Sequence, residues 1–285
     1  MASSPPGSPG RADVPDAPGI RDLARRYRIS PSRALGQHFL IDPNLARAIV
    51  ADAGVGPADR VVEIGAGLGS LTRALAATGA EILAIEFDRG LLPALEDVVR
   101  DLPRVRILAA DATKLDWGAT LGEAVWTACA NLPYNVAVPL MERVLSDALG
   151  IRHMVVMVQK EVGERMVARP GQQGYGPFSL RVGYHASASI LRSVPATVFW
   201  PRPKVGSLVV RIDRLDRPAV KTDPGRLWQV VGAGFAGRRK TIRAALRPLA
   251  PDPDHVLLAA GIDPSARAEA LPLEAFARIA EALTS

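Results

Sequence analysis

The stretch Val61-Val62-Glu63-Ile64-Gly65-Ala66-Gly67-Leu68-Gly69 indicates the fold of this chain of 285 residues. A strand-sized apolar run ends in a glycine-rich turn, and a segment with helical spacing follows. Glycine at positions 65 and 67 lets the backbone turn sharply and approach a ligand closely. The first turn of the following helix offers free N–H groups. The stretch therefore predicts a strand, a glycine loop and a helix that bind a nucleoside. The alternative is a tight turn without a ligand.

Strand-like and helix-like segments alternate over the next hundred residues. The strand-like runs are residues 60–64, 81–86, 105–109, 127–131 and 153–159, and helical spacing marks segments such as 68–78 and 90–100. Such alternation predicts βαβ units, and hence a mostly parallel sheet with helices on both faces. Two later runs, residues 183–190 and 207–212, predict an antiparallel pair of strands at one edge of the sheet.

Composition divides the chain into a tail and two folded parts. Residues 1–19 are rich in Pro, Gly and Ser, which predicts a disordered tail. Prolines, a glycine and alternating charges at 213–225 predict a linker. We therefore expect an α/β domain over residues 20–215 and a smaller domain over 216–285. The smaller domain is predicted to be all-helical, with helices at 227–235, 238–249, 255–260 and 273–283.

Several classes of protein and of site are not expected from the composition. The chain is 48% hydrophobic and 22% charged, as in ordinary globular proteins. No apolar run reaches the ~18 residues of a membrane span, and residues 1–19 lack the apolar segment of a secretory signal. Cys129 is the only cysteine, so we expect no disulfides and a reducing, cytoplasmic setting. The histidines lack metal-ligand spacing, so no metal is expected.

The net charge of +6 is concentrated in two segments. Residues 221–250 hold seven basic residues and one acid, and residues 21–33 hold five arginines and one acid. The i, i+4, i+8 spacing of Arg239, Arg243 and Arg247 predicts one basic stripe on a helix. Two basic clusters on a neutral body indicate a polyanionic partner, with nucleic acid as the leading candidate. The alternative is a solvated helix face.

Two carboxylates follow predicted strands near the glycine loop. Glu86 ends the second strand, 21 residues after Gly65, where a carboxylate can accept hydrogen bonds from both hydroxyls of a ribose. This arrangement suits NAD and S-adenosyl-L-methionine (SAM) equally. Ser70, however, stands where a dinucleotide fingerprint has its last glycine, which weakens the case for NAD as the ligand. Asp111 follows the third strand, where it can bind the exocyclic amine of an adenine or cap the next helix.

The tetrapeptide Asn131-Leu132-Pro133-Tyr134 closes the fourth predicted strand. The Asn131 side-chain carbonyl and the Leu132 backbone carbonyl can both accept hydrogen bonds from one amino group. Pro133 has a fixed φ angle, which holds these two acceptors in place. Tyr134 supplies a flat face for a base. Adenine N6 is a poor nucleophile, and two acceptors favour its more nucleophilic, pyramidal form in the transition state. The motif therefore predicts N6 methylation of adenine, and its alternative is a proline turn with a buried tyrosine.

These motifs resemble those of the ribosomal RNA adenine dimethyltransferases of the KsgA (RsmA) type, over residues 30–283. The further motifs that carry the resemblance are Leu35-Gly36-Gln37-His38-Phe39-Leu40, Glu86-Phe87-Asp88, Gln159-Lys160-Glu161-Val162, Tyr175-Gly176, Phe199-Trp200-Pro201-Arg202-Pro203-Lys204-Val205, and Phe235 with Arg238-Arg239-Lys240-Thr241. The resemblance implies a Rossmann-like, SAM-dependent methyltransferase domain at 20–215 and a helical rRNA-binding domain at 216–285. It also implies two methyl transfers to N6 of each of two adjacent adenosines near the 3′ end of 16S rRNA. The expected partner is the small ribosomal subunit, and the expected state is a cytoplasmic monomer without metal.

The resemblance also implies roles for individual residues. SAM would contact His38, Leu40, Gly65, Glu86, Asp111 and Asn131, and Gly67 joins them from the glycine loop. Catalysis would rest on Asn131, Leu132, Pro133, Tyr134 and Phe199, with Tyr134 and Phe199 stacking on opposite faces of the target adenine. The predicted contacts to rRNA phosphates are Arg238, Arg239, Lys240, Arg243 and Arg247. His38 stands where the family usually has Asn, and Ala66 replaces the more usual Pro.

Two alternatives belong to other classes of function. The first is a methyltransferase that acts on a large-subunit adenine and confers antibiotic resistance, since such an enzyme would share the motif at 131–134. The basic motif at 238–241 and the helical domain favour the small-subunit enzyme. The second is a non-catalytic RNA-binding assembly factor. The intact Gly65, Glu86, Asn131 and Tyr134 argue against it.

Overall fold

The structure is a computed structural model that describes residues 17–237 and 239–283. The predicted tail at 1–19 lies mostly outside the described residues, and its last three residues belong to helix α1 (Ala17–Arg26). The assignment of residues 17–19 to the tail is therefore wrong. The buried side chain of Ile20 explains the early start, because it anchors α1 in an apolar cluster with Phe39 and Leu68.

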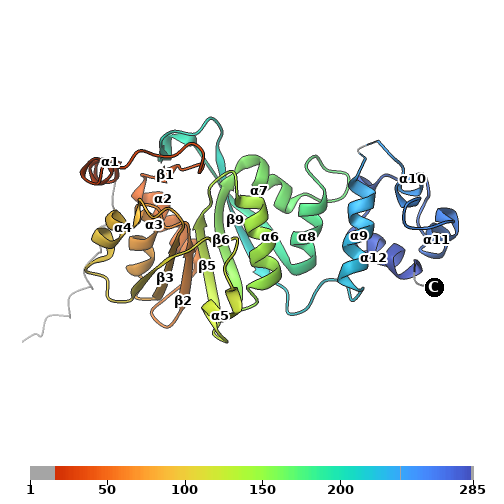
Figure 1. The fold of residues 1–285 in the computed structure, drawn as a ribbon, viewed down its shortest axis with the longest axis horizontal. Coiled ribbons are helices and arrows are strands. Elements are labelled where there is room, and N and C mark those ends of the chain that lie inside the picture. The colour runs from red at the N-terminus through yellow and green to blue at the C-terminus, as the bar shows by residue number, and fades with distance from the viewer. Residues whose placement is uncertain (1–16, 238, 284–285) are drawn as a thin grey trace, which may run out of the picture.

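A seven-stranded sheet forms the centre of the molecule, in the order β4-β3-β2-β5-β6-β9-β7 (Figure 1). Its first five strands run parallel, as predicted from the alternation of segments. The strands are β2 (Arg60–Ile64), β3 (Glu81–Glu86), β4 (Val105–Ala109), β5 (Trp126–Asn131), β6 (Ile151–Gln159), β7 (Ala186–Val194) and β9 (Ser207–Arg214). The predicted antiparallel pair at one edge is confirmed as β7 and β9.

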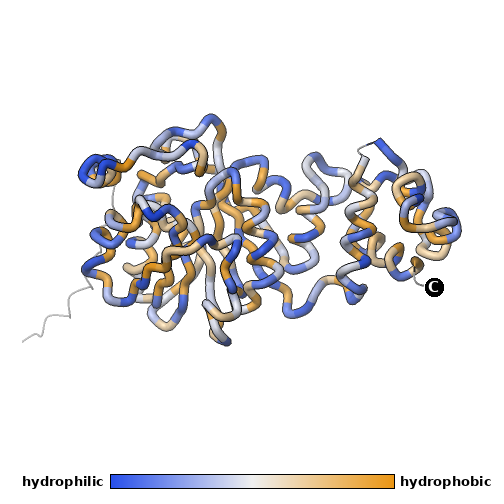
Figure 2. Tube along the Cα trace, viewed as in Figure 1, coloured by the Kyte–Doolittle hydropathy of each residue, from blue (hydrophilic) through white to orange (hydrophobic). Residues whose placement is uncertain are grey.

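Helices cover both faces of the sheet. One face carries α2 (Pro43–Ala53), α3 (Ser70–Ala76) and α4 (Leu92–Val99), whose apolar residues pack with Val61, Ile82 and Ala84. The other face carries α6 (Ala137–Asp147), α7 (Lys160–Val167) and α8 (Pro177–His185), with the short α5 (Trp117–Leu121). Figure 2 shows the strands mostly in orange and α1 with the surface loops mostly in blue.

The predicted strand at 183–190 needs correction at its start. Residues 183–185 are the last turn of α8, and the strand begins at Ala186. Val182 and Tyr184 alternate with smaller or polar residues, as expected for a strand. The same pattern also fits a helix that is buried on two sides, so such a short run does not distinguish a strand from a helix. In α8, Phe178 and Val182 pack against the sheet, whereas Leu180 and Tyr184 pack against the C-terminal helices.

The C-terminal helices form a second core at one end of the molecule (Figure 1). They are α9 (Pro224–Phe235), α10 (Ile242–Leu246), α11 (Pro253–Ala259) and α12 (Leu273–Ala282), with the single-turn η2 (Ala268–Ala270). The linker is shorter than predicted, because β9 continues to Arg214 and α9 begins at Pro224. The division at 215/216 stays a prediction, since α8 contributes side chains to both cores. No helix among the described residues is long and apolar enough to span a bilayer.

The predicted basic helix at 238–249 is wrong in its length. Of the described residues 239–249, only 242–246 are α-helical. Thr241 forms a β-bridge with Arg267 and caps the helix by accepting a hydrogen bond from Ala244 N at 3.3 Å. Arg243 therefore lies in the helix, whereas Arg239 precedes it and Arg247 follows it. These three arginines do not form one helical stripe. Arg238 lies outside the described residues.

Candidate active site

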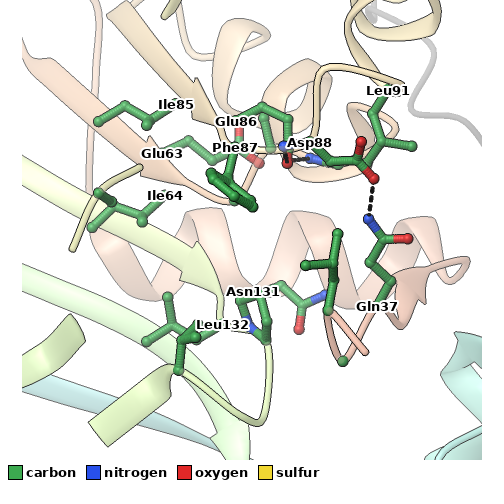
Figure 3. Close-up of a pocket in the computed structure, with 18 of the residues that line it drawn as sticks. Gln37, Glu63, Ile64, Ile85, Glu86, Phe87, Asp88, Leu91, Asn131 and Leu132 are labelled. Carbon is green, nitrogen blue, oxygen red and sulfur yellow. Dashed lines mark hydrogen bonds between the residues drawn. The ribbon is translucent and has the colours of Figure 1, made fainter. Parts of the chain in front are cut away.

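A cavity of about 280 Å³ opens at the carboxyl ends of β2, β3, β4 and β5. Figure 3 shows Glu86 and Phe87 on one side of it and Asn131 on the other. The structure brings together the strand-end residues that the sequence places far apart. Ten predicted site residues line the cavity: His38, Leu40, Gly65, Gly67, Glu86, Asp111, Asn131, Leu132, Pro133 and Tyr134.

The glycine loop forms the floor next to β2. Gly67 has φ +57°, in the left-handed region that favours glycine, and a Cβ atom there would lie 3.3 Å from the Phe39 ring. Gly69 has φ +79°, and a Cβ atom there would lie 2.6 Å from Val98 of α4. The glycines therefore allow the loop to pass closely between α4 and the N-terminal segment, with its backbone exposed to the cavity.

Glu86 holds the glycine loop against the end of β3. Its Oε2 accepts a hydrogen bond from Gly67 N at 2.8 Å, and its Oε1 accepts one from Asp88 N at 2.8 Å. Burial raises the pKa of this carboxyl, while the hydrogen bonds from Asp88 and Gly67 act in the opposite direction. Each carboxylate oxygen can accept more than one hydrogen bond. Glu86 can therefore bind ribose hydroxyls without releasing the loop.

Asp111 lines the cavity and also stabilises the turn that follows β4. Its Oδ1 accepts hydrogen bonds from Thr113 N at 3.0 Å and from Thr113 Oγ1 at 2.6 Å. The Thr113 hydroxyl contributes most to lowering the pKa of Asp111, which favours the ionised form. The alternative role as a helix cap is wrong, because Asp116 caps α5 by accepting a hydrogen bond from Ala119 N. An ionised carboxylate here suits an exocyclic amine.

Asn131 is oriented by the N-terminal segment. Its Nδ2 donates a hydrogen bond to the His38 carbonyl oxygen at 3.0 Å. Since the amide nitrogen is engaged, the Oδ1 atom is the free end of this side chain, and it accepts no hydrogen bond from any described residue. The Leu132 carbonyl likewise accepts none within the described part of the chain, although Leu132 N donates to Met157 O at 3.0 Å. The two acceptors required by the predicted chemistry are thus available.

His38 connects three parts of the site. Its Nδ1 lies 2.6 Å from the Pro201 carbonyl oxygen, and because a carbonyl can only accept, Nδ1 carries the hydrogen. The imidazole centroid lies 5.1 Å from that of Tyr134, at an angle of 37°. The Tyr134 hydroxyl in turn lies 2.8 Å from Ser207 Oγ, and burial raises the pKa of the phenol. The Tyr134 ring is therefore held at both ends.

The structure contradicts the predicted role of Phe199. Strand β8 (Phe199–Trp200), preceded by the single-turn η1 (Ala196–Val198), pairs antiparallel with β1 (Phe39–Leu40), and Phe199 lies opposite Leu40. Its side chain is 2% exposed and packs with Leu40 and Ile49 in the core. Phe199 does not line the cavity, so it supports Leu40 from behind and presents no ring face to a base.

Three further residues line the cavity, and the sequence predicts no individual role for them: Gln37, Phe87 and Asp88. Gln37 Nε2 donates a hydrogen bond to Asp88 Oδ2 at 2.7 Å, which ties the N-terminal segment to the loop after β3 (Figure 3). Phe87 lines the cavity with a side chain that is 57% exposed. All three lie within motifs that carried the resemblance. The signal was therefore present, but spacing alone did not indicate that the two loops meet.

The predicted RNA contacts that the structure describes do not line this cavity and lie in or beside α10. Arg239, Lys240 and Arg247 are exposed. Arg243 forms an ion pair with Asp254 at 2.7 Å, so its charge is partly compensated. Lys240 also lines a second, open hollow between α7 and α9. The described residues contain no cluster of metal-ligating side chains.

The cavity residues fit a SAM-type ligand. A glycine backbone with positive φ, a buried carboxylate on one side and an ionised Asp111 offer partners for the ribose and the adenine of an adenosine. The Oε2 atom of Glu63 is buried in the cavity wall without a hydrogen-bond partner among the described residues, which suits a cationic ligand. The bound cofactor would lie between Glu86 and Asn131.

Comparison with known proteins agrees with this chemistry. A family model described as ribosomal RNA adenine dimethylase matches residues 30–285. The chain is 42% identical over 274 residues to a ribosomal RNA small subunit methyltransferase A from Moorella thermoacetica, covering 92% of this chain and 95% of that one. A second protein of that name, from Kineococcus radiotolerans, is 44% identical over 270 residues, covering 92% and 89%.

A solved structure shares the fold at lower identity. A dimethyladenosine transferase from Plasmodium falciparum superposes with a TM-score of 0.73 at 22% identity, covering 85% of this chain and 96% of that one. The likeness supports the α/β fold. It confirms the predicted Rossmann-like fold. The family match and the relatives confirm the enzyme class and SAM as methyl donor. The chain belongs to the ribosomal RNA adenine dimethylase family.

Proposed function

We propose that this protein dimethylates N6 of two adjacent adenosines near the 3′ end of 16S rRNA during assembly of the small ribosomal subunit. The observation that carries the reaction is the orientation of Asn131, whose Nδ2 is bound to His38 O and whose Oδ1 is free. The substrate rests on relatives named for the small subunit, which match this chain over nearly its whole length.

The chain itself activates the amine by accepting hydrogen bonds. Asn131 Oδ1 and the Leu132 carbonyl each accept one N6 hydrogen, and Pro133 holds the two acceptors in a fixed relation. This withdraws the nitrogen lone pair from the ring, so the acceptors bind the transition state more strongly than the ground state. SAM, when bound, supplies the electrophilic methyl group. After the first transfer one N–H remains, and one acceptor suffices to hold it for the second.

The target base must leave its stack to reach these acceptors. Tyr134 supplies a ring face for it, and the ring is fixed by Ser207 and by His38. Phe199 is buried and does not line the cavity, whereas Phe87 presents an exposed aromatic ring there. Positioning and desolvation then provide most of the rate acceleration, because the sulfonium is already a good methyl donor.

The alternatives have less support. The 23S rRNA methyltransferase ErmE superposes with a TM-score of 0.67 over 87% of this chain and 100% of its own, but the identity is 24%, so the likeness concerns the fold. A non-catalytic assembly factor would not need the free acceptors at Asn131 and Leu132. The proposed substrate also assigns the enzyme to the cytoplasm, where ribosomal subunits are assembled. A monomer without metal stays a prediction.

Phosphate contacts are proposed for the basic residues in and beside α10. Arg239, Lys240 and Arg247 are exposed, and Arg238 is adjacent to them in sequence. Arg243 contributes less because of its ion pair with Asp254. Contacts to phosphates position a substrate without reading its bases. The helical domain would therefore bind the subunit while the cavity selects the adenosine.

The proposal is tested by methyl transfer from tritiated SAM to ribosomal subunits from a strain without the endogenous methyltransferase. We expect label on small subunits, with two methyl groups on each of two adenosines, and none on large subunits. The Asn131→Ala variant serves as the inactive control. Label on large subunits, or on neither, would contradict the proposal.

A further inference from the structure

A buried carboxyl in the cavity wall takes no part in activating the adenine amine. Glu63 is the penultimate residue of β2 and is 1% exposed. Val61 and Glu63 point toward the face covered by α2 and α3, whereas Val62 and Ile64 point toward α6. The position is thus a core position of the sheet, and a carboxyl occupies it at the edge of the cavity.

The groups that face Glu63 do not compensate a negative charge. Thr72 of α3 lowers the pKa of Glu63, but the Thr72 hydroxyl and Glu63 Oε2 are both buried, and neither has a partner with hydrogen-bond geometry among the described residues. Cys129 of β5 is a neutral thiol, since burial raises its pKa. Glu86 of β3 is a like charge and raises the pKa of Glu63 further. No described Lys, Arg or His forms an ion pair with Glu63.

The consequence for the free protein is a neutral carboxyl. Desolvation is the largest cause, and it raises the pKa of Glu63 to about 8. A buried carboxyl keeps its proton until an opposite charge arrives. Glu86 depends less on a cationic partner for its ionised form, because two backbone N–H groups already donate hydrogen bonds to its oxygens.

The cofactor of this family brings such a charge. At neutral pH, SAM carries a sulfonium, an ammonium and one carboxylate, so its net charge is +1. Its product, S-adenosylhomocysteine (SAH), has lost the sulfonium charge. A cation in a cavity of low dielectric favours the ionised form of a nearby acid.

We propose that Glu63 is a proton-linked cation subsite of the cofactor cavity, neutral in the free enzyme and ionised when SAM binds. SAM binding therefore releases the Glu63 proton. When the methyl group has moved to N6 and N6 has lost a proton to solvent, the cavity has lost the sulfonium charge and Glu63 takes up a proton again. The inference rests on SAM as the methyl donor and not on which rRNA is the substrate.

The test counts the protons released when SAM binds. Isothermal titration calorimetry in two buffers of different ionisation enthalpy gives this number for the wild type and for Glu63→Gln. The difference between them is the measured quantity, because the amino group of SAM titrates in both. A carboxyl with a pKa of about 8 predicts a difference of about 0.9 proton at pH 7 and about 0.1 at pH 9. SAH should give a smaller difference at pH 7.

Two controls keep the test decisive. Glu123→Gln removes an exposed carboxyl and should release as many protons as the wild type. If Glu63→Gln does not fold, infrared difference spectra of the wild type replace it. We expect SAM to remove the C=O band of a protonated carboxyl, and no loss of that band would refute the proposal.

Equal proton counts for wild type and Glu63→Gln at pH 7 would also overturn this inference. That outcome would leave the rRNA substrate untouched, since it concerns the cofactor alone. Conversely, a failure to methylate small subunits with normal proton release would overturn the proposed function and leave this subsite in place.

Discussion

Replacing Asn131 by Ala separates catalysis from binding in this enzyme. The substitution removes the Oδ1 acceptor and the hydrogen bond from Nδ2 to His38 O, which is 3.0 Å long. An acceptor that acts in the transition state is comparable to an oxyanion-hole donor, whose loss costs about 10²–10³ in kcat. The stability cost is smaller, about 1–3 kcal/mol for an unpaired carbonyl at His38. We therefore expect a large loss of turnover in a folded protein that still binds the small subunit.

The assay is single-turnover methylation of small subunits at saturating SAM, with subunit affinity from filter binding. Asn135→Ala is a matched control, because Asn135 Nδ2 also donates to a carbonyl of the N-terminal segment, Ala34 O at 2.8 Å. That variant loses an equivalent tether without losing the acceptor, so its rate should fall by about tenfold or less. Wild-type turnover in Asn131→Ala, or an equal loss in Asn135→Ala, would refute the two-acceptor mechanism.

Three further predictions concern the cofactor, the RNA and stability. Glu86→Ala should weaken SAM binding by at least roughly 10- to 150-fold, the loss expected for a single charge-assisted hydrogen bond of about 1.5–3 kcal/mol, and unchanged affinity by calorimetry would remove Glu86 from the site. Replacing Arg238, Arg239 and Lys240 together by Ala should flatten the slope of log affinity against log salt by about 0.7–0.9 per phosphate contact, and an unchanged slope would reduce the segment to a solubility feature. Because the folded-state pKa of Glu63 is raised from 4.5 to about 8, the folded protein binds the extra proton between these values. Its stability without SAM should therefore fall as pH rises through this window. Urea unfolding of wild type and Glu63→Gln checks this, and parallel pH profiles would contradict it.

The sequence predicts the sheet well because strand periodicity is local. Each of the five parallel strands is an apolar run bounded by polar or glycine residues, and their carboxyl ends meet at one edge by the geometry of βαβ units. Gly65, Glu86, Asp111 and Asn131 could therefore be assigned to one cavity without coordinates. The chemistry of Asn131 also follows from the types of residue in its motif.

Other features depend on contacts between distant segments. The length of α10 is limited by the bridge between Thr241 and Arg267, which no local pattern reveals. Phe199 is buried because β8 pairs with β1, some 160 residues earlier in the chain. In the sequence Glu63 is a polar residue in an apolar strand, and only the structure shows that its Oε2 atom has no hydrogen-bond partner in the described part of the chain.

The central claim is that this enzyme makes N6,N6-dimethyladenosine in 16S rRNA through Asn131. The most direct test is mass spectrometry of 16S rRNA from a strain that lacks its own methyltransferase and expresses either the wild type or Asn131→Ala. The account predicts two adjacent dimethylated adenosines near the 3′ end with the wild type and none with the variant. Dimethylation in large-subunit rRNA instead, or full modification by Asn131→Ala, would contradict it.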